Sequence, residues 1–209
     1  MQPNFSTAYF STAYLAPVEY YMQMLAFPQT VIEKHCNYVK QTYRNRCVIA
    51  SANGLQTLSI PIEKPETIKC LTKDIRIAEH DNWRHLHWIA IKSAYNSTPF
   101  FEYYEDDFIK FYERPYNFLF DFNESLRMLI TDLLDIEPQV TYSSEYKADF
   151  LSNEIDYRET IHPKKNPVTS SFKPYYQVFE SRFGFQPNLS IIDLLFNMGP
   201  ESIYILRQN

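Results

Sequence analysis

The hydrophobic periodicity of the chain changes once, near residue 80, and this change constrains the fold more than any other feature. Before it, short runs of apolar and β-branched residues alternate with turn signals, a pattern typical of strands. After it, apolar residues recur every three or four positions, a pattern typical of helices. This order predicts an α+β fold, in which a mostly antiparallel N-terminal sheet packs against a C-terminal set of helices.

A hairpin is the clearest expected element of the first part. Asn53-Gly54 is a strong signal for a tight turn, and apolar runs at 46–50 and 58–62 flank it. Around this hairpin we expect an extended segment at 5–16, a helix at 18–27, and strands at 30–33 and 74–78.

Three long helices are expected after residue 80, at 82–95, 100–112 and 116–134. Shorter helices at 175–183, 190–197 and 201–206 close the chain. Residues 145–174 are polar and broken by prolines, which predicts a long loop or lid. The sequence therefore predicts a single domain, residues 1–209, in which residues 145–174 form that loop or lid.

Charge and composition limit the classes of partner. The net charge of −5 argues against nucleic acid, whose binders present a basic field. No run approaches the roughly 18 apolar residues that a membrane helix needs, so we expect no membrane insertion. No signal peptide is recognised, and three cysteines without C-x-x-C spacing are typical of reduced thiols. We therefore expect a cytoplasmic protein. The net charge still allows a local basic pocket for a small anionic substrate, and the oligomeric state stays open.

Residues 80–88 concentrate more side-chain chemistry than any other window, with three histidines, two tryptophans, an arginine and an aspartate. On a helix, His87 shares the inner face with Trp83, whereas His85 points about 200° away. His87 is therefore the candidate proton-transfer residue, and Trp83 a candidate stacking wall. The alternative is a core histidine bound to backbone groups. Because no H-E-x-x-H or C-x-x-C spacing occurs, we expect neither a metal nor another cofactor.

A second candidate region is Tyr43-Arg44-Asn45-Arg46. In an extended chain, Arg44 and Arg46 point to one face and form a fork suited to a carboxylate or phosphate. The alternative is two solvated arginines paired with acidic residues. The remaining candidate substrate-binding residues, named for polar character and position near element ends, are Tyr43, Asn45, Asn53 and Glu19.

Five motifs occur in chain order and together cover most of the sequence. They are Tyr14-Leu15-Ala16-Pro17-Val18-Glu19-Tyr20-Tyr21, then Tyr43-Arg44-Asn45-Arg46, then Asn53-Gly54 with Leu58-Ser59-Ile60-Pro61-Ile62, then Asn82-Trp83-Arg84-His85-Leu86-His87-Trp88, and finally Asn188-Leu189-Ser190-Ile191-Ile192-Asp193-Leu194-Leu195-Phe196-Asn197. In combination they resemble the WbqC-like protein family, which is largely uncharacterised.

The resemblance implies a bacterial protein associated with gene clusters for surface polysaccharides such as O-antigen. It also implies a transferase of the glycine, aminoacyl or acyl type acting on a sugar or sugar nucleotide. The family's aromatic-Arg-Asn-Arg pattern corresponds to residues 43–46, and its Trp-x-x-x-His pattern to Trp83 with His87.

Two functions therefore remain open. In the first, the chain is an enzyme, and Arg44, Arg46 and His87 line one open cleft. In the second, the chain is a non-catalytic binding or assembly module, and the same residues form a sealed, hydrogen-bonded internal network. The positions of these three side chains distinguish the two.

Overall fold

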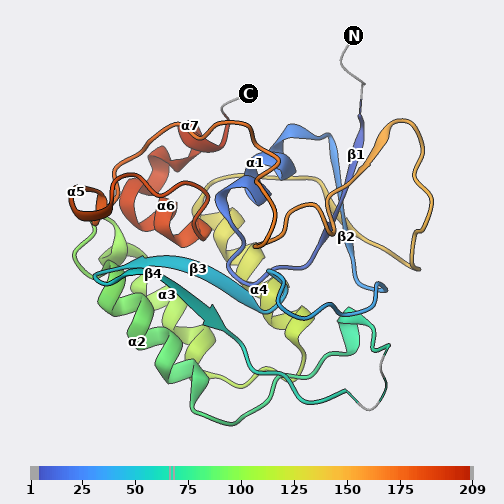
Figure 1. Cartoon of the computed structure of the whole chain (residues 1–209), viewed down its shortest axis with the longest axis horizontal. Helices are drawn as coiled ribbons and strands as arrows, with labels where there is room; N and C mark the ends of the chain where they lie inside the picture. The colour runs from blue at the N-terminus through green and yellow to red at the C-terminus, as the bar shows by residue number, and fades with distance from the viewer. Residues whose placement is uncertain (1–4, 66, 68, 208–209) are drawn as a thin grey trace.

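The computed structural model describes residues 5–65, 67 and 69–207. Its centre is a parallel four-stranded sheet beside a two-stranded hairpin, with helices around both (Figure 1). The sheet has the order β5-β2-β1-β6, and Phe10 of β1 lies opposite Ile32 of β2. Its strands are β1 (Thr7–Ser11), β2 (Gln29–Glu33), β5 (Val140–Tyr142) and β6 (Glu154–Asp156).

The first helix explains why the sheet is parallel. β1 leads into α1 (Val18–Ala26), which returns the chain to the start of β2. Pro17 precedes the helix with φ −66°, so its ring causes no conflict at the helix start. A strand–helix–strand connection places its two strands side by side in the same direction, whereas a short turn would make them antiparallel.

The expected N-terminal antiparallel sheet, and with it the α+β class, is wrong. The fold is α/β with a mostly parallel sheet, and only the hairpin is antiparallel. The strand–helix–strand order at residues 5–33 was visible in the sequence, but the hairpin was taken to represent the whole sheet. The outer strand β6 has three residues, too few to give a periodic signal.

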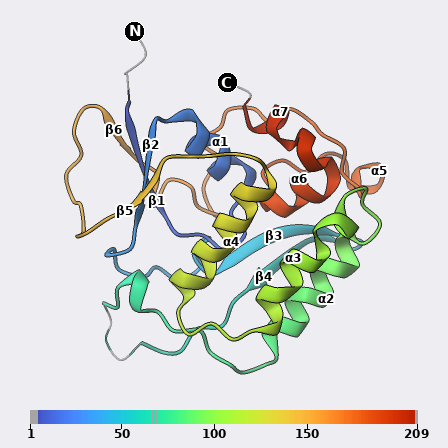
Figure 2. The ribbon, with the colours of Figure 1, turned by 180° about the vertical axis from the view of Figure 1, so that it is seen from behind.

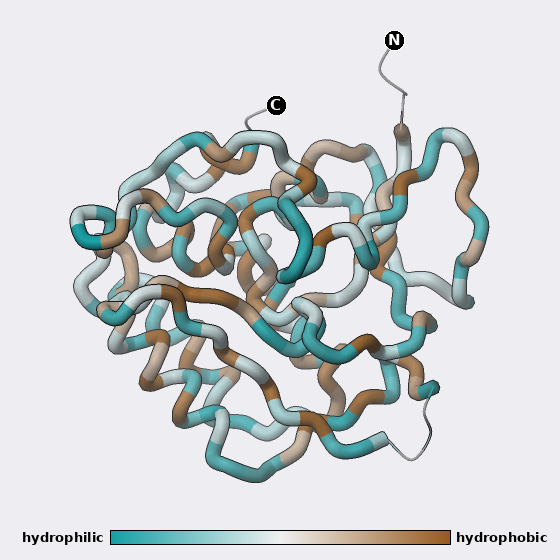
Figure 3. Tube along the Cα trace, in the orientation of Figure 1, coloured by the Kyte–Doolittle hydropathy of each residue, from teal (hydrophilic) through white to brown (hydrophobic). Residues whose placement is uncertain are grey.

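The hairpin forms where the Asn53-Gly54 signal places it. It consists of β3 (Arg46–Ser51) and β4 (Gly54–Ser59), and Cys47 lies opposite Leu58. Gly54 has φ +105°, a conformation that favours glycine. β3 is brown for most of its length in Figure 3, which fits its burial between helices.

The long helices expected after residue 80 are confirmed within a few residues, because their periodicity is local. They are α2 (Trp83–Tyr95), α3 (Phe101–Glu113) and α4 (Leu119–Leu133), followed near the C-terminus by α6 (Ile191–Met198). β3 packs against α2 on one side and α6 on the other. In Figure 2, α4 runs between the four-stranded sheet and the hairpin.

Several short elements complete the chain. The expected strand at 74–78 is instead a 3-10 turn followed by isolated β-bridges at Arg76 and Ile77. The expected loop at 145–174 contains β6, so part of it belongs to the sheet. The short helices are η1 (Thr72–Asp74), α5 (Glu180–Phe183), η2 (Gly199–Glu201) and α7 (Ser202–Leu206).

Within the described ranges, the helices are all too short or too polar to cross a lipid bilayer.

Candidate functional site

The carboxyl ends of the four parallel strands gather polar and charged residues at one edge of the sheet. β1 ends at Ser11, which lies opposite Glu33 at the end of β2, and β6 ends at Asp156. Since all four strands point the same way, the segments that follow them meet at this edge. Open parallel sheets bind their ligands there, in the crevice outside the carboxyl ends.

Arg158 and Glu33 form the most completely paired cluster at this edge. The Arg158 guanidinium donates from Nε and Nη2 to both Asp156 oxygens at 2.9 Å, and from Nη1 to Glu33 Oε2 at 3.3 Å. Glu33 also accepts a hydrogen bond from Ser143 Oγ at 2.7 Å and from the His35 backbone N–H at 2.7 Å. Both side chains are buried, and their mutual pairing offsets the cost of removing two charges from water.

A second complete cluster lies on α4, close to the end of β1. Glu124 accepts hydrogen bonds from Thr12 Oγ1 and from Arg127 Nε, each at 2.7 Å. The Tyr142 hydroxyl donates a hydrogen bond to the same carboxylate at 3.2 Å. Burial opposes the charged form of Arg127, but the charge of Glu124 outweighs it and raises the pKa of the guanidinium.

Arg44 is the exception among the buried arginines. Its side chain is 1% exposed, yet its one carboxylate partner among the described residues is Glu159, at 2.6 Å from Nη2. Its other contacts are weak ones, Nη1 to Thr42 Oγ1 at 3.4 Å and Nη2 to Cys36 Sγ at 3.7 Å. The Nε–H is buried without a hydrogen-bond partner. A buried charge with a vacant donor is costly, and such a group is uncommon unless it serves a site.

The partner of Arg44 is held much less firmly than Arg44 itself. The backbone carbonyl of Arg44 accepts a hydrogen bond from Asn123 of α4 at 2.8 Å, which fixes the arginine to the core. Glu159 is 51% exposed, on the segment that follows β6. The Arg44 backbone is therefore anchored and its side chain is buried, whereas the carboxylate that covers the guanidinium is half exposed and can exchange with another anion.

Arg44 and Arg158 line one small cavity at the end of β1. Its volume is about 10 Å³, which is the lower limit for a single water molecule. A ligand therefore fits only after neighbouring side chains move. The remaining lining residues are Ser11, Thr12, Ala13, Tyr20, Thr42, Tyr43, Tyr157 and Ile161.

Further positive charges surround the exposed side of this cavity. Lys165 Nζ donates to the Glu159 carbonyl oxygen at 2.8 Å. Burial lowers the pKa of His162, and the charges of Arg44 and two neighbouring lysines add to this shift, although Glu159 opposes it. Arg44 and two lysines therefore lie close to the Glu159 carboxylate beside this cavity.

Only part of the predicted arginine motif reaches this cavity. Tyr43 and Arg44 line it, whereas Arg46 starts β3 and is not among its lining residues. Residues 43–45 form turns, so the extended fork expected for the two arginines is absent. Asn45 donates to the Ile60 carbonyl oxygen at 2.9 Å and fixes the base of the hairpin. Asn53 lies at the other end of the hairpin, in its turn.

His87 lies apart from the arginines, in the core. Its Nδ1 is 3.0 Å from the Tyr14 hydroxyl, which is 2.8 Å from the Tyr112 hydroxyl, and its ring donates to the backbone of Ser59. Burial lowers its pKa to about 4, although the Ser59 contact opposes the shift. Both ring nitrogens have partners, and His87 is not among the residues that line the Arg44 cavity. Its inward orientation is confirmed, but it does not share a cavity with Arg44.

Trp83 and Glu19 also have structural surroundings. The Trp83 ring packs edge-on against His87 at 5.1 Å and against Phe122 at 5.7 Å, and its Nε1 has no hydrogen-bond partner. The buried Glu19 carboxylate accepts hydrogen bonds from the Val168 N–H and from Asn188 Nδ2, each at 2.8 Å. Glu19 therefore ties α1 to two distant segments.

The sequence analysis missed most of the charged residues at the sheet edge. Arg158 and Glu159 fell in the expected loop, and Glu33 and Glu124 were treated as ordinary parts of a strand and a helix. The missed signal was Ser11-Thr12 and Glu33 ending two strands joined by a helix, since such strands are parallel and their ends meet. Among residues 5–65, 67 and 69–207, no group of three or more His, Cys, Asp or Glu is arranged to hold a metal ion.

Comparison with known proteins agrees with the motifs. The model of the WbqC-like protein family matches residues 12–162, well over half of the chain and including Arg44, Arg158 and Glu159. The uncharacterized protein Rv1507c of Mycobacterium tuberculosis is 25% identical over 215 residues, covering 90% of this chain and 91% of that protein. No solved structure matches the chain. On the extent of the family match, this chain belongs to the WbqC-like protein family.

Proposed function

We propose that this chain is a cytoplasmic transferase that binds the anionic part of a sugar nucleotide, or of an aminoacyl or acyl donor, at the carboxyl edge of its parallel sheet. The proposal places it in surface-polysaccharide biosynthesis, the setting that the family resemblance implies. The observation that carries it is the incomplete pairing of Arg44, a fixed and buried guanidinium with one carboxylate partner and a vacant Nε–H.

The geometry of a guanidinium explains which ligand suits this vacancy. Nε and Nη2 point in nearly parallel directions and together bind a carboxylate or phosphate through two hydrogen bonds. In Arg44, Glu159 occupies Nη2 alone, and Nε stays vacant. An incoming oxyanion that engages both donors therefore completes what Glu159 leaves incomplete.

Displacement of Glu159 is the step that this proposal requires. Because the carboxylate is half exposed, it becomes hydrated when it leaves, at little cost. Tyr43 lines the same cavity and carries a phenolic hydroxyl for the ligand, whereas the Thr42 hydroxyl already donates to the Val39 carbonyl oxygen at 2.9 Å. His87 has no part in the proposed binding step, because both of its ring nitrogens bond to core groups.

The test is calorimetric titration of the full chain with uridine diphosphate glucose and with acetyl-coenzyme A. Arg44→Gln removes the charge, and we expect it to weaken binding of the true ligand class by about tenfold or more, the effect of losing a charge-assisted hydrogen bond. The control is Arg76→Gln, which removes a half-exposed arginine paired with Glu63.

Circular dichroism and the melting temperature show whether each variant is folded. If folded Arg44→Gln binds as tightly as the wild type, the proposed role of Arg44 is wrong. If the wild type binds neither probe, nor inorganic diphosphate, the transferase proposal loses its support.

A second function has its own supporting observation. The clusters around Arg158, Glu124 and His87 are complete hydrogen-bonded networks inside the fold. Such networks suit a non-catalytic binding or assembly module, whose polar interior fixes the geometry of its elements. This alternative predicts that small anions bind neither the wild type nor Arg44→Gln.

A further inference from the structure

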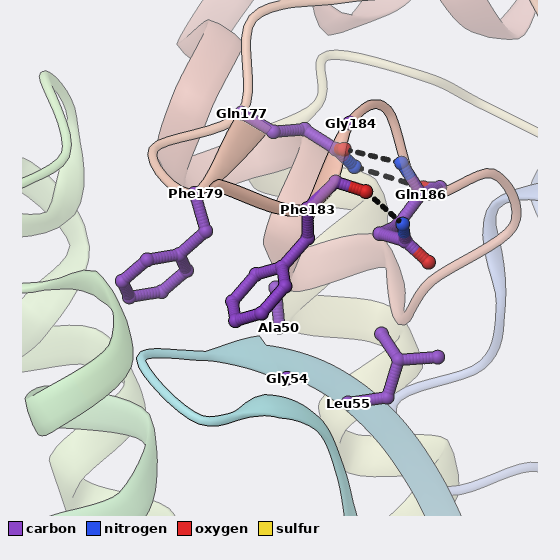
Figure 4. A pocket seen from close by; sticks show the side chains of 8 residues that line it. All are labelled: Ala50, Gly54, Leu55, Gln177, Phe179, Phe183, Gly184 and Gln186. Atoms are coloured by element: carbon purple, nitrogen blue, oxygen red, sulfur yellow. Dashed lines mark hydrogen bonds between the residues drawn. The ribbon is translucent and has the colours of Figure 1, made fainter. Parts of the chain in front are cut away.

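A second cavity lies at the far end of the hairpin, between β3–β4 and residues 177–186 (Figure 4). Its volume is about 210 Å³, whereas a cavity of roughly 150 Å³ lined by apolar side chains already binds benzene. Ala50 and Leu55 of the hairpin form one side of the cavity, and Phe179 and Phe183 face them from the opposite segment. The whole wall at 177–186 lies beyond residue 162, outside the part of the chain that matches the family model.

The wall opposite the hairpin is held in place by buried groups. Gln177 Oε1 accepts the Gln186 backbone N–H at 2.8 Å, and its Nε2 donates to Asp193 Oδ2 at 2.8 Å. Asp193 is completely buried, and it also accepts the hydroxyls of Tyr175 at 2.7 Å and Tyr95 at 3.0 Å. The cavity is therefore preformed, because its polar support is satisfied without a ligand.

Two aromatic rings make the cavity suitable for a flat ligand. Phe179 and Phe183 are four residues apart around α5, so their rings lie on the same face of that helical turn, as Figure 4 shows. Phe183 is 37% exposed and Leu55 58% exposed, so a planar apolar body placed between them removes apolar surface from water. Arg182 ties α5 to the hairpin turn through the Ala52 carbonyl oxygen, which keeps the rings beside Leu55.

One polar atom in the cavity wall indicates which hydrogen-bonding group the edge of that ligand should carry. Gln186 Nε2 donates to the Phe183 carbonyl oxygen at 2.9 Å, which fixes the orientation of the side-chain amide. Its Oε1 receives no hydrogen bond from any described residue, and Figure 4 shows this oxygen without a dashed line. The cavity therefore presents apolar walls and one fixed, vacant acceptor, which is complementary to a planar ring with an N–H donor on its edge.

We propose that this cavity binds a purine base with an exocyclic amine, the adenine type, with its rings against Phe179 and Phe183 and its amine donating to Gln186 Oε1. A bicyclic base fits the volume better than a single ring, and stacking on phenylalanine suits any base. The amine distinguishes adenine from a purine without one. The inference is independent of the proposed function, because it involves no residue of the carboxyl-edge site.

The experiment titrates the full chain with adenosine, followed by ligand-observed NMR. We expect Phe183→Ala to raise the dissociation constant by about tenfold, the effect of losing one stacking platform. Tyr103→Ala removes an exposed aromatic ring from α3 that does not line the cavity, and we expect no change. Binding by Phe183→Ala equal to that of the wild type, or no binding of adenosine to the wild type, overturns the proposal.

Purine riboside, which lacks the amine, tests the role of Gln186. We expect Gln186→Leu to weaken adenosine binding and to leave purine riboside binding unchanged. Equal loss for both nucleosides would contradict the proposed hydrogen bond. Arg44→Gln separates the two sites: adenosine carries no anionic group, so its binding is unaffected by that change even if the proposed function fails.

Discussion

Two arginines line the same small cavity, and they differ in how completely they are paired. Arg158 is bound through both oxygens of Asp156 and by Glu33, and its guanidinium stacks over Tyr146 at 5.0 Å. Arg44 is buried more deeply but has one half-exposed carboxylate and a vacant Nε–H. Burial alone therefore does not separate a structural charge from a binding charge, whereas the completeness of pairing does.

The difference has a thermodynamic meaning. Removing one partner from a complete buried pair leaves an uncompensated charge, at a cost of about 3–5 kcal/mol. Removing an arginine that is already incompletely paired leaves behind only a carboxylate that water reaches. The region around Arg158 is therefore expected to stabilise the fold, and the region around Arg44 to contribute to binding.

The largest expected change in stability is the loss caused by Glu33→Ala. Glu33→Ala leaves four donors without their acceptor, among them Arg158 Nη1 and Ser143 Oγ. We expect the free energy of unfolding to fall by about 3–5 kcal/mol in urea denaturation. The control Glu63→Ala removes an exposed carboxylate 3.3 Å from Arg76, and its effect should stay below about 1 kcal/mol. A loss at Glu33 no larger than at Glu63 would remove the basis for calling the Arg158 region structural.

The next largest expected effect is the change in folding stability with pH that the ionisation of His87 causes. Burial lowers the pKa of His87 from 6.5 to about 4 in the folded protein. Between these values the unfolded chain binds a proton that the folded chain does not, so stability falls as the pH decreases from 6.5 to 4. The total loss is about 3 kcal/mol at full effect, since each pKa unit corresponds to about 1.4 kcal/mol.

Comparison with His87→Gln isolates this contribution. Burial raises the pKa of Asp193 from 3.8 to about 6, so Asp193 has the opposite effect, adding stability as the pH falls through 6. Asp193 is present in both proteins and cancels in the difference. Urea denaturation at pH 7 and pH 4 should therefore show a larger loss in the wild type than in His87→Gln. Equal losses would mean that His87 is hydrated, and that the core around it is open.

Arg44→Met should have a much smaller effect on stability. Methionine fills much of the buried volume without a charge, and Glu159 is free to turn into solvent. Replacement of a buried ionic group by an apolar one is often neutral or stabilising, so we expect a change between zero and a gain of about 1 kcal/mol. Urea denaturation measures it. A loss above about 2 kcal/mol would place Arg44 with Arg158 as a structural charge and would remove the contrast between the two regions.

How much of this the sequence could predict depends on the range of each signal. Helices α2, α3 and α4 were predicted because their apolar spacing is local, and His87 was correctly placed on the inner face of α2. The parallel sheet was not predicted, because β6 pairs with β1 across about 145 residues and has only three residues. No periodic signal reports a pairing of that kind.

The residues of the candidate site also divide into those that the sequence predicted and those that it did not. Tyr43 and Arg44 were named from their chemistry, and both line the carboxyl-edge cavity. Arg158 lines that cavity, and Glu159 pairs with Arg44, only because β6 joins the parallel sheet. A prediction that treated residues 145–174 as a loop could not place them there. Arg46 was grouped with Arg44 by its spacing in an extended chain, and Asn53 by its polar character, whereas the hairpin carries Asn53 to its far end.

The smallest expected effect concerns Glu159 itself, and its direction matters more than its size. Glu159→Gln removes the anion that competes for Arg44 and leaves the side-chain volume unchanged. A half-exposed ion pair is worth about 0.2–1 kcal/mol, so we expect binding of uridine diphosphate glucose, or of whichever anion binds in the titrations, to tighten roughly 1.5- to 5-fold. Calorimetry measures the change.

Removing any negative charge near a positive site favours anions, so a matched control is needed. Glu145→Gln removes an exposed carboxylate that has no ion pair among the described residues, and its effect reports the general field alone. If both variants tighten binding equally, Glu159 is an ordinary surface charge. If Glu159→Gln weakens binding, the carboxylate contacts the ligand instead of competing with it. Only tightening specific to Glu159 supports exchange at Arg44, because that result requires both anions to use the same guanidinium.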